Sequence, residues 1–93
     1  MTNSRPATYD EDLLALLRLH RQRRRLRQLD LAKLLGKSQA TVSKVEKGLQ
    51  GLSISELSQW LAALDLNLID FMCELKLRHA SARDSEEVDP PFT

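Results

Sequence analysis

The stretch QLDLAKLLGKSQATVSKVEK, residues 28–47, decides the fold that we predict for this chain of 93 residues. Its apolar residues recur at helical spacing and predict two short helices, Gln28–Leu35 and Gln39–Glu46. Each helix ends at a glycine, Gly36 or Gly48, which takes the left-handed stop conformation without strain. The turn through Gly36 is too tight for any other common arrangement, so the stretch predicts one compact two-helix unit.

One face of the second helix in this unit is predicted to stay outside. The residues that hold the unit on the core are Leu31, Leu35, Val42 and Val45. The side chains left outside are short or carry amides, the kinds that read base edges, and lysines follow at the far end. They are Gln39, Ala40, Thr41, Ser43, Lys44 and Lys47. The alternative is an ordinary solvated helix face, but the two-helix geometry and the glycine placement favour DNA reading.

Three further helices and no strand are predicted outside this unit. The patterns T-x-x-E at residues 8–11 and S-x-x-E at residues 53–56 are capping boxes, which begin a first and a fourth helix. The first helix closes in the cationic run RQRRR, residues 21–25, and a fifth helix follows Asn67 out to about His79. The expected fold class is therefore all-α with five helices.

The two ends of the chain differ from the part between them. Residues 1–7 are expected to form a flexible N-terminal arm. The acidic, proline-ended residues 81–93 lack a helical period and are expected to form a disordered tail. The folded domain is expected to cover residues 8–80.

The fourth and fifth helices carry much apolar surface. One face of the fourth helix is expected to consist of Ile54, Leu57, Leu61 and Leu64. Trp60 lies beside that face, either at the edge of the core or in a dimer contact. The fifth helix is apolar on more than one side, which favours a homodimer packed through residues 67–79 over a wider monomer core. Its Cys73 is expected to be buried or in an interface rather than to act as a redox sensor.

The charge of the chain is divided along its length. The sequence has 14 Lys and Arg against 13 Asp and Glu, a net charge of +1. Residues 13–48, however, carry ten basic and two acidic residues, a local charge of +8. The segments on either side are acidic. A polyanion would therefore meet a local positive field that the net charge conceals.

Several classes of protein are disfavoured by what the sequence lacks. A single Cys excludes an internal disulfide and a cysteine-cluster metal site, which fits a reducing compartment. No apolar run reaches the roughly 18 residues of a membrane span, so we expect a cytoplasmic protein with no membrane partner. No nucleophile with a base, carboxylate pair or phosphate-binding glycine loop indicates an enzyme, and no cofactor is expected. His20 and His79 are interpreted as a packed and a surface histidine.

The segment LAKLLGKSQATVSKVEKG resembles the helix-turn-helix of the lambda-repressor and Cro family of bacterial and phage regulators, and the resemblance extends over about Leu13–Phe71. In that family the third helix lies in the major groove with its N-terminal residues on the bases. The resemblance implies a buried pair between Arg21 and Glu46. It also implies a phosphate contact by Gln28. The implied DNA-binding residues are Gln28, Ser38, Gln39, Ala40, Thr41, Ser43, Lys44 and Lys47.

Three positions depart from the pattern of this family. Arg25 stands at a usual glycine, so the first turn is expected to be built differently or the first helix extended. Arg27 replaces the usual Ser or Thr cap, for which Asp30 is expected to compensate partly. Lys37 replaces a common apolar residue. Each change adds positive charge beside the predicted DNA face.

The resemblance implies a sequence-specific transcriptional regulator that binds a partly palindromic operator in double-stranded DNA as a homodimer. A repressor or autoregulator is expected, of the phage, mobile-element or restriction-modification controller type. The alternative is the antitoxin of a toxin-antitoxin pair, which would also bind a toxin protein through the tail or the N-terminal arm.

Overall fold

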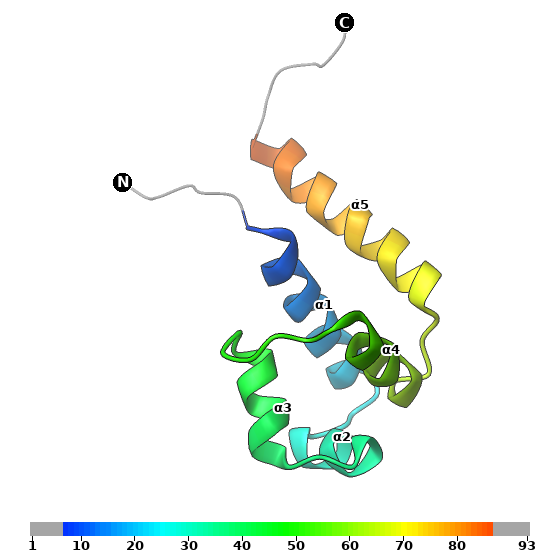
Figure 1. The fold of residues 1–93 in the computed structure, drawn as a ribbon. Helices are drawn as coiled ribbons and strands as arrows, with labels where there is room; N and C mark the ends of the chain where they lie inside the picture. Colours follow the sequence, from blue (N-terminus) through cyan, green and yellow to red (C-terminus); the bar gives the residue numbers. More distant parts are fainter. Residues whose placement is uncertain (1–6, 87–93) are drawn as a thin grey trace, which may run out of the picture.

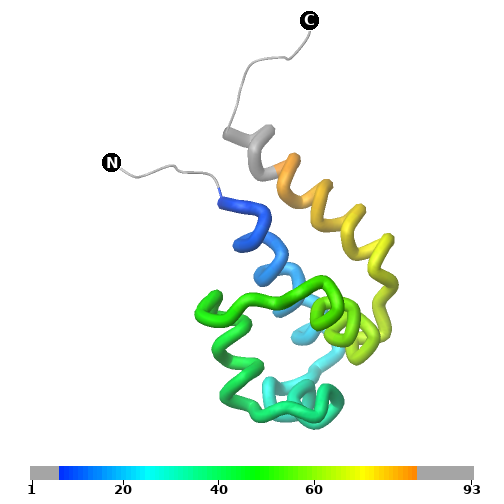
Figure 2. Tube along the Cα trace, in the orientation of Figure 1, coloured from blue at the N-terminus to red at the C-terminus, as the bar shows by residue number. Residues whose placement is uncertain are grey.

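The structure is a computed structural model that describes residues 7–86, and the side chains of residues 7–81. The described part contains five helices and no strand, as the sequence predicts. The helices are α1 (Tyr9–Arg23), α2 (Gln28–Leu35), α3 (Gln39–Glu46), α4 (Ile54–Ala63) and α5 (Leu68–Glu86). The α2–α3 pair lies at one end of the molecule, away from the start of α1 and the end of α5, and α1 and α5 run side by side (Figures 1 and 2).

The predicted starts of α1 and α4 are confirmed. Both helices begin with a complete capping box, in which the hydroxyl of Thr8 or Ser53 accepts from the N–H of the glutamate three residues later. That glutamate, Glu11 or Glu56, in turn accepts from the backbone N–H of the cap residue. These bonds pair N–H groups that have no partner within the helix, which fixes where each helix begins.

The start of α2 is stabilised from the third helical position. Arg27 caps the helix without a side-chain acceptor, and its backbone N–H donates to Asp30 Oδ2 at 2.8 Å. The Arg27 guanidinium binds the same carboxylate. This side-chain hydrogen bond, with the backbone one, lowers the pKa of Asp30 to about 2. The compensation expected of Asp30 is therefore confirmed.

Four helices end in the same left-handed turn. One residue of each turn has a positive φ: Gly36 (69°), the cap of α2, and the residues after the caps of α1, α3 and α4, which are Arg25 (60°), Gly48 (79°) and Asp65 (61°). In each case the next N–H donates back to the carbonyl five residues earlier, at 2.7–3.1 Å. The expectation that Arg25 forces a different turn or a longer α1 is therefore wrong. The arginine adopts the left-handed conformation, although a side chain there costs about 1–2 kcal/mol.

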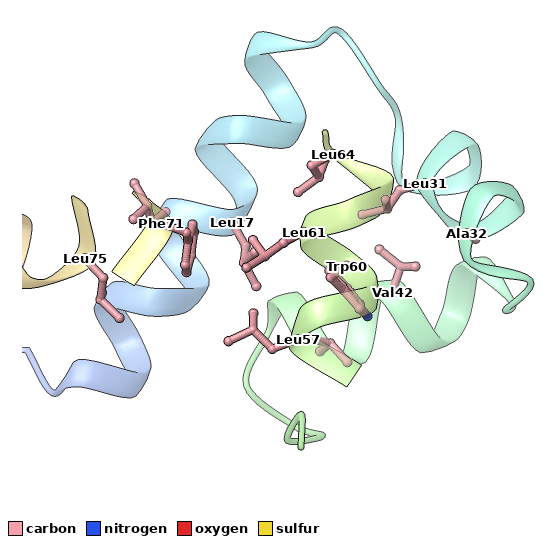
Figure 3. Close-up of a cluster of buried hydrophobic side chains, with 12 residues drawn as sticks. Leu17, Leu31, Ala32, Val42, Leu57, Trp60, Leu61, Leu64, Phe71 and Leu75 are labelled. Carbon is pink, nitrogen blue, oxygen red and sulfur yellow. The ribbon is translucent and has the colours of Figure 1, made fainter. Parts of the chain in front are cut away.

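The core gathers apolar side chains from all five helices (Figure 3). Trp60 is 1% exposed and lies within this core, which decides its role in favour of packing within the chain. Ile54 is 68% exposed, so the prediction that it faces the core is wrong. The buried face of α4 includes the indole of Trp60 and not the side chain of Ile54, because burying the larger side chain removes more apolar area from water.

The fifth helix is longer than expected. It begins after Asn67, whose Oδ1 accepts from the N–H groups of Ile69 and Asp70. It continues to Glu86 rather than ending near His79, so the expected tail is helical in its first residues, 81–86. No glycine or proline interrupts this stretch, and its residues permit a helix without an apolar period. The rest of the expected tail, 87–93, and residues 1–6 of the expected arm lie outside the described residues.

Two histidine–carboxylate pairs hold α5 against α1. His20 Nε2 lies 2.8 Å from Glu74 Oε1, and His79 Nδ1 lies 2.7 Å from Asp12 Oδ2. The ring of Tyr9 stacks on His79 with 3.8 Å between the centroids. The side chain of His79 is only 12% exposed, so its interpretation as a surface histidine is wrong. These pairs position α5.

No helix among the described residues is long and apolar enough to cross a membrane.

The opposite side of α5 is open to solvent. Phe71 and Leu75 are buried against the core, but Ile69 and Leu77 are more than two-thirds exposed. Cys73 is exposed as well, so the single chain does not bury its thiol, and the interface alternative remains a prediction.

Candidate nucleic-acid interface

The helix α3 is held on the core by one side and leaves the predicted reading face free. Val42 and Val45 are fully buried on the inner side. The Ser38 hydroxyl caps the helix, accepting from the Thr41 N–H at 3.1 Å, and lies 3.0 Å from the Thr41 hydroxyl. Among the predicted DNA-binding residues of this segment, the exposed ones are Ser38, Gln39, Ala40, Lys44 and Lys47, and the half-buried ones are Thr41 and Ser43. The structure thus brings these residues together on one accessible surface.

Gln28, the remaining predicted contact, is half-buried at the start of α2. Its Nε2 donates to Glu46 Oε1 at 2.9 Å, and its Oε1 accepts from Gln39 Nε2 at 2.7 Å. Both ends of this amide are therefore engaged by α3. The phosphate contact that the family resemblance implies for Gln28 stays a prediction. Local patterns do not reveal the two bonds, because they join residues 18 and 11 positions apart.

The predicted pair between Arg21 and Glu46 is confirmed. Arg21 donates to both carboxylate oxygens, with 2.6 Å from Nε to Oε2 and 3.0 Å from Nη2 to Oε1. The carboxylate side chain is 1% exposed and that of Arg21 is 10% exposed. Arg21 Nη1 also donates to the carbonyl of Leu26, which ties the turn after α1 to the same cluster. A bidentate pair of this kind fixes the relative position of α1 and α3.

The surroundings of Glu46 keep it ionised. Burial acts to raise its pKa, but the hydrogen bonds from Arg21 and Gln28, together with the charges of Arg21 and Arg18, outweigh burial. The pKa of Glu46 therefore lies below its usual value. Arg18 contributes from the surface, with its Nε 3.5 Å from Glu46 Oε1.

The positive charge of residues 13–48 is carried almost entirely on the surface. Of the ten basic residues in this segment, only Arg21 is buried. The exposed ones are Arg18, Arg23, Arg24, Arg25, Arg27, Lys33, Lys37, Lys44 and Lys47. They belong to α1, α2, α3 and the turns that follow these helices, so this part of the molecule presents a field that attracts phosphates. Within residues 7–81, no group of His, Cys, Asp and Glu is arranged to hold a metal ion.

Comparison with known proteins identifies the family. The sequence profile of the helix-turn-helix family of lambda-repressor and Cro type matches residues 17–71, more than half of the chain. The chain therefore belongs to this family, whose members are DNA-binding transcription regulators. The resemblance read from LAKLLGKSQATVSKVEKG is confirmed.

Solved structures share the arrangement of the helices. The clp gene regulator ClgR from Corynebacterium glutamicum is 24% identical, with a TM-score of 0.76 over 88% of this chain and 87% of that one. The wild-type restriction-modification controller protein C.Esp1396I is 17% identical, with a TM-score of 0.74 over 81% of this chain and 97% of that one. At these identities the likeness shows the fold. No curated protein matches the sequence.

Proposed function

We propose that this protein is a sequence-specific transcriptional repressor or autoregulator that binds a partly palindromic operator as a homodimer. The observation that carries the proposal is the exposed face of α3. This helix is capped and held on the core, in the part of the molecule that carries the nine exposed basic residues of residues 13–48. In this role α3 enters the major groove, and Gln39 and Lys44 read bases. A glutamine suits N6 and N7 of adenine, and a lysine suits O6 and N7 of guanine.

The other predicted contacts complete this interface. Ala40 lies flush with the bases, and Ser38, Thr41, Ser43 and Lys47 reach bases or phosphates. The exposed arginines at the end of α1 and in the following turn supply attraction that does not depend on sequence. Gln28 borders this surface, in contact with Gln39.

The open side of α5 supports the homodimer. Its exposed apolar side chains are Ile69, Met72, Cys73 and Leu77. Beside Met72 the surface continues into a groove of about 370 Å³ between α1 and α4, lined by Leu13, Leu52, Ile54 and Leu57 among others. Packing of two such faces about a two-fold axis covers this surface and places two recognition helices in successive major grooves, about 34 Å apart.

The biological setting that we propose rests on similarity to known regulators and not on contacts within the structure. Likeness to a restriction-modification controller and to a gene regulator supports a regulator that acts by occupying a promoter. The antitoxin alternative would require a surface for a toxin protein, which is expected on the tail or the N-terminal arm, and residues 87–93 and 1–6 of these lie outside the described residues.

Selection of binding sites from random duplex DNA with the purified full chain tests the proposal. We expect one enriched sequence with two related half-sites separated by about one helical turn, and a match to it in the promoter of the gene that encodes the chain. Enrichment of no sequence over random duplexes would overturn the proposal. A single unrepeated half-site would remove the homodimer and leave the DNA-binding function.

A further inference from the structure

A groove that the proposed function does not use runs along α1, and we call it the α1 groove. It has a volume of about 610 Å³ and is bounded by α1, the end of α3 and one residue of α5, Arg78. Its apolar lining comes from α1, where Leu14 and Leu19 are half-buried and Ala15 is exposed. An apolar strip with charged residues around it is typical of a surface that binds another segment.

The charges along the α1 groove are unevenly distributed. Asp10 and Glu11 lie at its start, in the first turn of α1. Further along, Arg18 lines the groove from α1, with a side chain that is 47% exposed, and Lys47 lines it from the end of α3. Glu46 lies there too, but its side chain is only 1% exposed and belongs to the buried ion pair. The half of the groove nearer α3 therefore attracts acidic groups.

Helix α5 brings the chain to the end of the molecule where α1 begins (Figure 1). Its Arg78 lines the groove, with Nε 3.8 Å from Asp12 Oδ1 on α1. The helix continues for eight residues beyond Arg78 to Glu86, a rise of about 12 Å. The seven residues that follow, 87–93, span about 23 Å when extended. They are therefore long enough to turn back past Arg78 by about 11 Å, the rise along α1 from Asp12 to Leu19.

The sequence of this segment, EVDPPFT, complements the α1 groove. It has two acidic residues, Glu87 and Asp89, and no Lys or Arg. Phe92 stands far enough along the segment to reach the apolar lining, and a phenylalanine that docks there covers a large apolar area. The two prolines have few backbone conformations to lose on docking, which lowers its entropic cost. Residues 1–6 carry Arg5 and no acid, so the cationic half of the groove disfavours them.

We propose that the α1 groove is the docking site of residues 87–93 of the same chain. In the docked state Phe92 lies on the apolar lining beside the guanidinium of Arg18, a neighbour that an aromatic ring favours. Asp89 then lies beside Arg78, because the extended segment from Glu86 to Asp89 spans about 10 Å.

Docking of this segment lowers the attraction of the domain for DNA. It brings two negative charges near Arg18 and Lys47, and Lys47 is one of the predicted DNA-binding residues. A duplex must displace the segment or bind against its charge, so the affinity for every sequence falls. The docking itself is independent of the proposed function, whereas this effect on affinity rests on it.

Phe92→Ala in the full chain tests docking without a change of charge. We expect this variant to bind a random duplex about 2- to 30-fold more tightly than the native chain, the range of two exposed charge pairs. Ala15→Gln places a longer neutral side chain in the groove and should raise the affinity to the same extent. The double variant should show no further rise, because both changes remove the same contact. Ala62→Gln, at an exposed alanine on α4, is the matched control and should leave the affinity unchanged.

A variant without the acidic groups separates docking from the general field of the segment. Glu87→Gln combined with Asp89→Asn removes both charges, and it raises the affinity whether the segment docks or only repels DNA. A rise in this variant, with none in Phe92→Ala or Ala15→Gln, would overturn docking.

The methyl resonances of Leu14 and Leu19 report docking without DNA. The ring of Phe92 should shift them in the native chain, and Phe92→Ala should remove that shift. Identical methyl spectra of the two chains would overturn docking. Isotope-labelled Phe92→Ala chain is also mixed with unlabelled native chain. Return of the native shifts in the labelled chain would show that the segment docks on a second copy, which would overturn the assignment to the same chain.

The two measurements keep the two proposals apart. Failure of the native chain to bind any duplex would overturn the proposed function, and the methyl resonances would still decide whether the segment docks.

Discussion

Two residues hold left-handed conformations that a glycine would adopt more easily. Arg25 and Asp65 follow the caps of α1 and α4 with φ near 60°. The turns persist because the backbone bonds that close them are made, with 3.1 Å from Leu26 N to Arg21 O and 2.7 Å from Leu66 N to Leu61 O. The left-handed strain is therefore offset by hydrogen bonds and by packing of the leucine that follows.

Replacement of Arg25 should stabilise the fold. We expect Arg25→Gly to raise the free energy of unfolding by about 0.5–1 kcal/mol, because glycine removes the left-handed strain but adds chain entropy to the unfolded state. Urea unfolding followed by Trp60 fluorescence measures this. Arg25→Ala is the control, since it removes the same charge and keeps the strain. Equal gains in both variants would mean that repulsion among the arginines, and not the backbone, is the cause.

Glu46 should make the fold sensitive to acid. Its pKa is lower in the folded chain than its ordinary 4.5, so the ionised carboxylate stabilises the fold. That contribution is complete above pH 4.5 and is lost as the pH falls below 4.5 through the folded value. We expect Glu46→Gln to cost about 2–3 kcal/mol at pH 7 and to flatten the loss of stability in acid. Thermal unfolding between about pH 2 and 7 measures this.

The carboxylate of Asp30, whose side chain is 30% exposed, is the comparison for this acid experiment, because its pKa is also lowered, to about 2. Asp30→Asn should flatten the loss of stability at low pH less than Glu46→Gln, since solvent reaches and screens the pair of Arg27 and Asp30. If Glu46→Gln loses stability at low pH as the native chain does, the buried pair of Arg21 and Glu46 does not govern stability in acid.

Among the helices, α3 carries the test of base reading. We expect Lys44→Ala to weaken binding to the selected operator by about 1–3 kcal/mol and to relax the preference at one base pair. Gln39→Ala should do the same at another base pair. Titration of operator duplexes with single substitutions measures both effects, and Gln59→Ala on α4 serves as the control. Unchanged sequence preference in both variants would show that α3 does not present the reading face.

The open side of α5 carries the test of assembly. Leu77→Glu places a charge where two copies of the helix are proposed to meet, and the change occurs twice in a symmetric dimer. We expect the dimer to weaken by about 3–6 kcal/mol, since each leucine loses about 1.5–3 kcal/mol of burial. Sedimentation at several concentrations measures the dissociation constant. Gln59→Glu makes the same charge change on α4 and should leave the dissociation constant of the dimer unaltered. Equal dissociation constants in the two variants would place the dimer contact elsewhere.

For the molecule as a whole, the distribution of charge predicts that the affinity for operator DNA falls steeply with salt concentration. A dimer that makes about 6–10 phosphate contacts should lose some 10³ to 10⁵ in affinity between about 50 and 200 mM salt. The net charge of +1 does not predict this, because residues 13–48 hold ten basic residues and only two acidic ones, and the other eleven acidic residues belong to the rest of the sequence. Measurement of operator affinity at several salt concentrations checks the expectation. A shallow slope would mean that the exposed basic residues do not meet phosphates.

The parts of this structure that were predictable depend on residues close together in the chain. Capping boxes, glycine stops and apolar spacing act within a few positions, so they predict the bounds of α2 and α3 and the starts of the other helices. The end of α5 was missed, because a helix can continue through polar residues that give no periodic signal. Family resemblance added the pair of Arg21 and Glu46, which spacing does not reveal.

The sequence was therefore sufficient for the order of the helices, the class of protein and the identity of the face that α3 exposes. Other features required the folded chain: the burial of Trp60 in place of Ile54, the pairing of His79 with Asp12, and the bonds from Glu46 through Gln28 to Gln39. These depend on which surfaces meet when distant segments pack, such as residues 67 positions apart at His79 and Asp12. Local patterns establish which residues can form a helix, but packing establishes which side of the helix is buried and which atoms its polar groups meet.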